Sequence, residues 1–199
     1  MRLRNISRVI VIALVVVVSA VALLHERFAQ SAAPTLVGGD VLNAATPSFR
    51  LHDQSGALVD MKSLRGHPVV VTFLDMTCTQ ECPLQAHMLQ QAGNFLGAKQ
   101  ANQVDWLVVS VNPNNTPADA NAFMQKNNVK LPIKVLLGSQ AELKPVWASY
   151  YIDVQPTPTD VNHTVALFLI DKSGRERMVF LGSFDPKAVS TDLATLLKQ

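Results

Sequence analysis

An uninterrupted apolar run, HPVVVTFLD at residues 67–75, limits most strongly what this chain can fold into. Its β-branched residues and its lack of polar alternation are typical of a central strand that is buried on both faces. A second run of this kind, VDWLVVSV, lies at residues 104–111, and apolar residues at helical spacing lie between the two, over residues 84–96. Buried strands that alternate with helices predict an α/β sheet covered by helices.

The later part of the chain continues this alternation. Helix-start signals occur at TPAD (residues 116–119), at the capping box SQAE (residues 139–142) and at Asp185-Pro186. The other expected elements are a hairpin over 49–61, a strand over 133–137, an irregular loop over 153–162, a hairpin over 163–182 and a final helix that reaches Leu197. This order predicts a thioredoxin-like α/β fold, in which a mixed β-sheet is flanked by helices and preceded by an N-terminal hairpin.

The charge of the chain is small and unevenly distributed. The formal net charge is +2, and residues 1–30 alone carry +3, so the remainder carries −1. A nearly neutral domain offers no basic surface for the phosphate backbone of a nucleic acid. We therefore expect no nucleic-acid partner.

The first 30 residues have the pattern of an export segment. Three arginines in MRLRNISR precede sixteen uncharged residues at 9–24, and a positive flank before an apolar run leaves the N-terminus in the cytoplasm. The segment is interpreted as a retained inner-membrane anchor, with cleavage at Ala20-Val21-Ala22 and secretion as the alternative. We expect a tether over residues 31–46 and a domain over residues 47–199 on the periplasmic side.

The two cysteines, Cys78 and Cys82, are the only ones in 199 residues. Pro83 fits the first turn of a helix, where its missing N–H leaves no hydrogen bond unmade, and Thr79 is a candidate N-cap. This places Cys78 just before the helix and Cys82 in its opening turn. Free N–H groups and the helix dipole at such a position are expected to lower the pKa of both thiols.

Several roles for the cysteine pair remain open. Two buried cysteines can serve simply as small apolar residues, and a disulfide that closes so short a loop stabilises by only about 2 kcal/mol. Structural zinc requires four ligands, so two sulfurs are too few. Two thiolates and one imidazole suit Cu(I), and a redox-active thiol pair is the other chemical reading.

A copper site of this kind needs one histidine near the sulfurs. His25 lies in the export segment, His52 in the first hairpin, and His67 at the end of its strand opposite the cysteines. His87 is about half a helical turn out of phase with the cysteines. His163 remains, because in a thioredoxin-like sheet the loop that ends there packs beside the two-cysteine turn.

The motif Cys78-x-x-x-Cys82-Pro83 after a strand, the segment VSVNPNNTP and a late His163 before LFLID resemble the Sco/SenC family. The layout of the first hairpin is also similar, and the resemblance covers roughly residues 45–198. It implies a membrane-anchored, thioredoxin-fold copper protein that delivers Cu(I) or Cu(II) to the dinuclear copper centre of a respiratory oxidase. It also implies that Cys78, Cys82 and His163 are the copper ligands.

The chain departs from the usual family pattern at three positions. Thr79 stands where proline usually follows the first cysteine, Asn162 where aspartate usually precedes the histidine, and His67 where lysine is common. Without the adjacent carboxylate, His163 needs another group to orient its ring, for which Asp160 is a candidate.

Three other functions compete with the metallochaperone. In a periplasmic thiol-disulfide oxidoreductase, which some family members resemble and which would use a partner thiol reductant, Cys78 attacks and Cys82 resolves the mixed disulfide. In a peroxidase, Thr79 and Cys82 form a Thr-x-x-Cys motif, although Asp75 stands where proline is expected. The last alternative is a membrane-anchored sensor or scaffold without catalytic activity. The glycosylation sequon at residues 162–164 is interpreted as coincidental.

Overall fold

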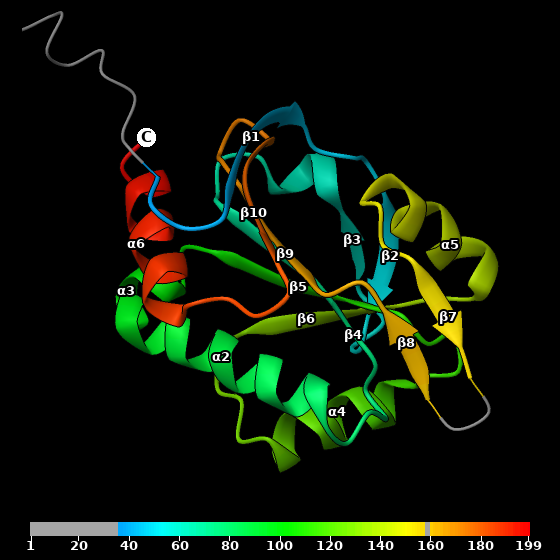
Figure 1. Cartoon of the computed structure of the whole chain (residues 1–199). Coiled ribbons are helices and arrows are strands. Elements are labelled where there is room, and N and C mark those ends of the chain that lie inside the picture. The colour runs from blue at the N-terminus through cyan, green and yellow to red at the C-terminus, as the bar shows by residue number, and fades with distance from the viewer. Residues whose placement is uncertain (1–35, 158–159) are drawn as a thin grey trace, which may run out of the picture. The chain divides into compact units, whose positions relative to one another are not determined.

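A mixed eight-stranded β-sheet forms the centre of residues 36–199 (Figure 1). In this computed structural model the described residues are 36–157 and 160–199. The strands, in their order across the sheet, are β1 (Asp40–Ala45), β10 (Arg175–Leu181), β9 (Ala166–Ile170), β4 (Val69–Leu74), β5 (Asp105–Ser110), β6 (Ile133–Leu137), β2 (Arg50–Asp53) and β3 (Leu58–Asp60).

The central strands run as a thioredoxin-like plan requires. β4 pairs in parallel with β5, and β5 in parallel with β6, whereas β9 is antiparallel to β4. Val71 in β4 faces Leu107 of β5 on one side and Phe168 of β9 on the other. This confirms the predicted mixed α/β fold.

Helices cover both faces of the sheet. They are η1 (Met61–Leu64), α2 (Glu81–Leu96), α3 (Ala98–Ala101), α4 (Pro117–Lys126), α5 (Gln140–Ser149) and α6 (Pro186–Leu196). α2, α4 and α6 bury apolar side chains against one face, and α5 buries its own against the other. Because successive side chains of a strand alternate, Leu74 joins the first core and Phe73 the second. All six residues of β4 are buried, and five of them are apolar, because neither face of this strand meets water.

The predicted helix caps lie where the sequence puts them. Thr116 accepts the N–H of Asp119 while the Asp119 carboxylate accepts the N–H of Thr116, and Ser139 and Glu142 form the same reciprocal box at α5. Asp185 caps α6. At α2, however, the N-cap is Gln80 rather than the predicted Thr79, and no side chain caps this helix.

Residues 40–45, predicted as part of the tether, instead form β1 at the edge of the sheet against β10. Gly38 and Gly39 look like linker residues, yet a Cβ on Gly38 would collide with the ring of Phe180. Gly39 has φ +37°, which favours glycine, and its Cα lies against β10. The Asp192 carboxylate accepts the N–H groups of Val37 (2.7 Å) and Gly38 (3.0 Å). The glycines permit this close docking, so the ordered domain begins earlier than predicted.

The predicted loop at 153–162 also contains regular structure. β7 (Val154–Pro156) and β8 (Val161–His163) form a separate two-stranded sheet, in which Val154 pairs with His163. The predicted membrane segment at residues 9–24 lies outside the described residues. Among the described residues, no helix combines the length and apolarity needed to cross a membrane.

Candidate metal centre

The two cysteines lie where β4 connects to α2: Cys78 is in the connecting turn, and Cys82 is in the first turn of the helix. Cys78 donates its N–H to the carbonyl of Asp75 (3.4 Å), which closes the turn just after β4 ends. The N–H of Cys82, in the first turn of α2, donates to the sulfur of Cys78 (3.4 Å). Both are free thiols, Cys78 half-buried and Cys82 buried. The predicted placement before and within the opening helical turn, with Pro83 in that turn, is confirmed.

The electrostatics of Cys82 differ from the prediction. Burial raises the pKa of the Cys82 thiol well above its usual range, and the nearby Cys78 and the Asp75 carboxylate add to this increase. The main-chain N–H of Asp75 opposes the shift but does not overcome burial. The expectation that the helix start lowers this pKa is therefore wrong for Cys82, because loss of hydration outweighs the helix dipole.

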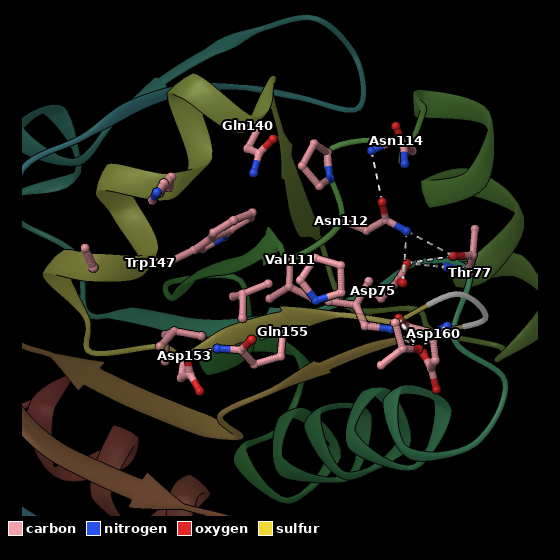
Figure 2. Close-up of a pocket in the computed structure, with 18 residues that line it drawn as sticks. Asp75, Thr77, Val111, Asn112, Asn114, Gln140, Trp147, Asp153, Gln155 and Asp160 are labelled. Atoms are coloured by element: carbon pink, nitrogen blue, oxygen red, sulfur yellow. Dashed lines mark hydrogen bonds between the residues drawn. The ribbon is translucent and has the colours of Figure 1, made fainter.

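A buried carboxylate, Asp75, organises the turn that carries Cys78. Its Oδ1 accepts the N–H and the hydroxyl of Thr77 (both 2.8 Å) and the amide of Asn115 (2.9 Å). Its Oδ2 accepts the amide of Asn112 (3.0 Å), as Figure 2 shows. Asp75 itself is only 2% exposed.

The same network joins the turn that carries both cysteines (residues 75–82, the cysteine turn) to the loop between β5 and α4. The Asn115 side-chain oxygen accepts the N–H of Met76 (2.9 Å) and the hydroxyl of Ser110 (2.9 Å). Two loops that are about 40 residues apart in sequence are thereby fixed against each other. Sequence reasoning missed this network. Its only visible signals are an aspartate at the end of an apolar strand and the polar segment NPNNT after the next strand.

His163 lies at the end of β8, with its ring held by the main chain. Its Nδ1 lies 3.0 Å from the carbonyl oxygen of Thr164. A carbonyl oxygen only accepts hydrogen bonds, so Nδ1 carries the proton and Nε2 keeps its lone pair. Metal-binding histidines commonly have this arrangement, in which one ring N–H donates to a carbonyl while the other nitrogen is free to bind. The other candidate for orienting the ring, Asp160, accepts the N–H of Val161 instead (2.8 Å).

One pocket of about 730 Å³ separates the cysteine turn from the β7–β8 hairpin (Figure 2). Asp75 and Thr77 line it from the turn, and Val154 and Val161 line it from the hairpin. Trp147 of α5 also lines it. The segments that carry the predicted sulfur and nitrogen ligands are thus neighbours on one pocket.

The structure does not gather the three predicted ligands into one cluster. Among the described residues, no three His, Cys, Asp or Glu side chains are close enough to hold a metal ion together. The other described histidines contact different partners. His67 lies 3.3 Å from Asp105 before β4, and His87 lies 2.9 Å from the side chain of Gln91 on α2.

Comparison with known proteins identifies the family of this chain. The sequence model described as SCO1/SenC matches residues 40–198. The chain belongs to the SCO1/SenC family. It is similar to the structure of Bradyrhizobium japonicum ScoI with copper bound, at 29% identity and a TM-score of 0.69 over 77% of this chain and 100% of that one. It is also similar to the structure of BsSco, at 22% identity and a TM-score of 0.68 over 80% of this chain and 97% of that one. BsSco is described as a member of the Sco family of cytochrome c oxidase assembly proteins, in which a disulfide switch was identified.

The chain is also similar to a peroxiredoxin. It is 26% identical to the chloroplastic peroxiredoxin Q of Populus jackii over 77% of this chain and 66% of that protein. The chain spans about two thirds of the length of the curated relatives that it matches. A peroxidatic cysteine must react as a thiolate, and the raised pKa of Cys82 beside the Asp75 carboxylate works against that role.

Proposed function

We propose that this member of the SCO1/SenC family is a copper metallochaperone whose ligands are Cys78, Cys82 and His163. The observation that carries the proposal is the pairing of the two sulfurs, in which the N–H of Cys82 donates to the sulfur of Cys78 within a single turn. ScoI of Bradyrhizobium japonicum, which is similar to this chain, is described with copper bound.

The chemistry of the donors fits copper better than other common metals. Two thiolates and a neutral imidazole nitrogen form a soft, three-ligand set that suits Cu(I) and accommodates Cu(II). A structural zinc site would require a fourth ligand, and magnesium or calcium would require oxygen ligands. The free lone pair at Nε2 of His163 supports its role as the nitrogen ligand. Binding by all three requires the imidazole and the sulfurs to approach each other, because only neighbouring residues of their segments, such as Thr77 and Val161, line the pocket between them.

Copper binding at this site is coupled to proton release. Burial raises the pKa of Cys82, so its thiol is protonated at neutral pH when no metal is bound. Because the thiolate is the form that binds metal, copper displaces this proton. The apparent copper affinity therefore rises as the pH increases.

The proposed client and location follow the family. We infer that the copper passes by ligand exchange to a respiratory oxidase subunit that carries a copper centre, since BsSco is described among the cytochrome c oxidase assembly proteins. Residues 9–24 would tether the domain of residues 36–199 to the inner membrane on its periplasmic side, because an arginine-rich flank precedes an uncharged apolar run.

Copper titration of the reduced full chain in the presence of a competing chelator tests the proposal. We expect one copper per chain. Copper affinity should fall by more than about 100-fold in Cys78→Ser and in Cys82→Ser, because loss of a metal ligand costs more affinity than loss of a group that hydrogen-bonds to a ligand and orients it. His87→Ala, on the exposed side of α2, is the matched control and should bind as the parent does. Unchanged binding in either cysteine variant would refute the assignment.

A thiol-disulfide oxidoreductase is the second candidate, supported by the two free thiols in one turn. In this reaction the thiolate of Cys78, the more exposed of the two, attacks a substrate disulfide and expels one substrate thiol. Cys82 then attacks the mixed disulfide and releases the second thiol, which leaves a Cys78–Cys82 disulfide. His163→Ala distinguishes the two functions, because it should reduce copper binding while sparing disulfide reduction.

A further inference from the structure

Asp75 is a buried carboxylate that is hydrogen-bonded by neutral groups alone. Its four donors are the N–H and hydroxyl of Thr77 and the amides of Asn112 and Asn115. None of the ion pairs formed by the described residues includes Asp75. A buried negative charge usually has a cationic partner, because the loss of hydration is otherwise costly. Among the described residues, hydrogen bonds therefore surround the Asp75 carboxylate and no cationic side chain pairs with it.

Asp75 lies next to both cysteines, through its main chain for Cys78 and through both its main chain and its carboxylate for Cys82. The carbonyl of Asp75 closes the turn with the N–H of Cys78, and its main-chain N–H points to the sulfur of Cys82. Consistent with this proximity, the carboxylate contributes to the raised pKa of Cys82. Asp75 also lines the pocket that faces the β7–β8 hairpin. Water screens a charge poorly in such a buried place, so the carboxylate acts on whatever charge the sulfurs carry.

We propose that Asp75 is a positioning residue of the copper site, which fixes the cysteine turn through Thr77, Asn112 and Asn115 and whose uncompensated charge favours Cu(II) over Cu(I). This inference rests on the proposed function. It assigns to Asp75 a role that neither the cysteine motif nor the histidine supplies.

The direction of the effect follows from the charge at each oxidation state. With two thiolates and a neutral imidazole, a Cu(I) site carries −1 and a Cu(II) site is neutral. On reduction Cu(II) takes one electron from an external mediator, the ligands keep their protonation, and the site becomes more negative by one charge. The neighbouring carboxylate opposes this change, so it lowers the copper reduction potential.

The test is a spectroelectrochemical titration of the copper-loaded full chain with redox mediators. Asp75→Asn removes the charge and nearly preserves the shape, and Asp75→Ser is a second neutral variant whose hydroxyl can still accept the N–H of Thr77. We expect both to shift the Cu(II)/Cu(I) equilibrium toward Cu(I) by about tenfold, which is about 59 mV for a one-electron couple.

Thr77→Val is the matched control, because it removes one hydrogen bond to Asp75 and keeps the charge. We expect it to shift the equilibrium by less than about threefold. A potential that stays unchanged in both neutral variants would overturn the inference, as would an equal shift in Thr77→Val. These outcomes leave the proposed function intact, whereas failure of the parent chain to bind copper would refute that function itself. The free energy of unfolding of the metal-free variants, measured in urea, separates loss of the fold from the electrostatic effect.

Discussion

The cysteine turn and the β7–β8 hairpin supply the two halves of the proposed copper site, and they are built very differently. The turn lies between a strand buried on both faces and a sixteen-residue helix, and the Asp75 network ties it to a second loop. The hairpin consists of two three-residue strands in a sheet of its own, and none of their side chains is buried. Its His163 is oriented by a carbonyl next to it in sequence.

This difference suggests a division of labour within the site. In the proposed site the two sulfurs are positioned in the metal-free protein, because hydrogen bonds join Asp75, Thr77, Cys78 and Cys82 within their turn and Cys82 is buried. The imidazole is preset in its tautomer and is carried by an element with few interactions that restrain its position. A ligand set of this kind suits a carrier, since one ligand can leave without disturbing the other two.

The largest effect should come from the hairpin ligand. His163→Ala should lower copper affinity by about 100-fold or more, because loss of a ligand costs at least as much as loss of the group that orients it. Competition with a chelator measures this affinity, and urea unfolding of the metal-free protein should change little. Copper affinity equal to that of the parent would remove the hairpin from the site.

The next effect concerns rigidity. Asn115→Ala should lower the free energy of unfolding by about 2–3 kcal/mol, because it leaves the buried N–H of Met76 without its partner and removes one of the four donors to the Asp75 carboxylate. Gln155→Ala in β7 is the matched change in the hairpin, where an exposed amide contacts only Asp153, and it should cost no more than about 0.5 kcal/mol. Equal losses in urea unfolding would contradict the contrast between the two halves.

The third effect is a pH dependence of the metal-free protein. The folded-state pKa of Cys82 is raised by burial, so the native state keeps a proton that the unfolded state releases. Its contribution to stability is complete below the ordinary thiol pKa of about 8.5 and is lost as the pH rises above it. The free energy of unfolding should therefore fall more steeply between pH 8.5 and 10 in the parent than in Cys82→Ala, by up to about 1.4 kcal/mol per pH unit. Parallel pH profiles for the two proteins would show that Cys82 is not perturbed.

The smallest effect is expected at Asn162. Adjacent residues of a strand point to opposite faces, so a carboxylate at this position would lie away from the His163 ring, whose Nδ1 already donates to Thr164. Asn162→Asp should change copper affinity by less than about threefold, since the new carboxylate would not hydrogen-bond to the His163 ring. A gain of tenfold or more would show that the side chain at 162 orients the imidazole after all.

The sequence predicts the cysteine half of the site well because local rules decide it. Apolar runs identify β4 and β5, reciprocal caps identify α4 and α5, and Pro83 places the cysteines at the start of α2. The Asp75 network could not be predicted, since it depends on how two distant loops meet. The pKa of Cys82 was mispredicted because the depth of burial is a tertiary property.

The hairpin half and the first strand are less visible in the sequence. Two three-residue strands with a proline and mixed polar residues give no clear alternation, so residues 153–162 look like a loop. Gly38 and Gly39 look like a linker, and only contact with Phe180 and Asp192 reveals why glycine is needed there. In both cases the partner strand or ring, rather than the segment itself, determines the structure.

X-ray absorption spectroscopy of the full chain loaded with one Cu(I) counts the atoms bound to the metal and so tests the three-ligand copper site itself. We expect two sulfur neighbours and one imidazole nitrogen in the parent, with the nitrogen lost in His163→Ala and retained in His87→Ala. A copper site without imidazole nitrogen in the parent, or a reduced protein that binds no copper, would contradict it.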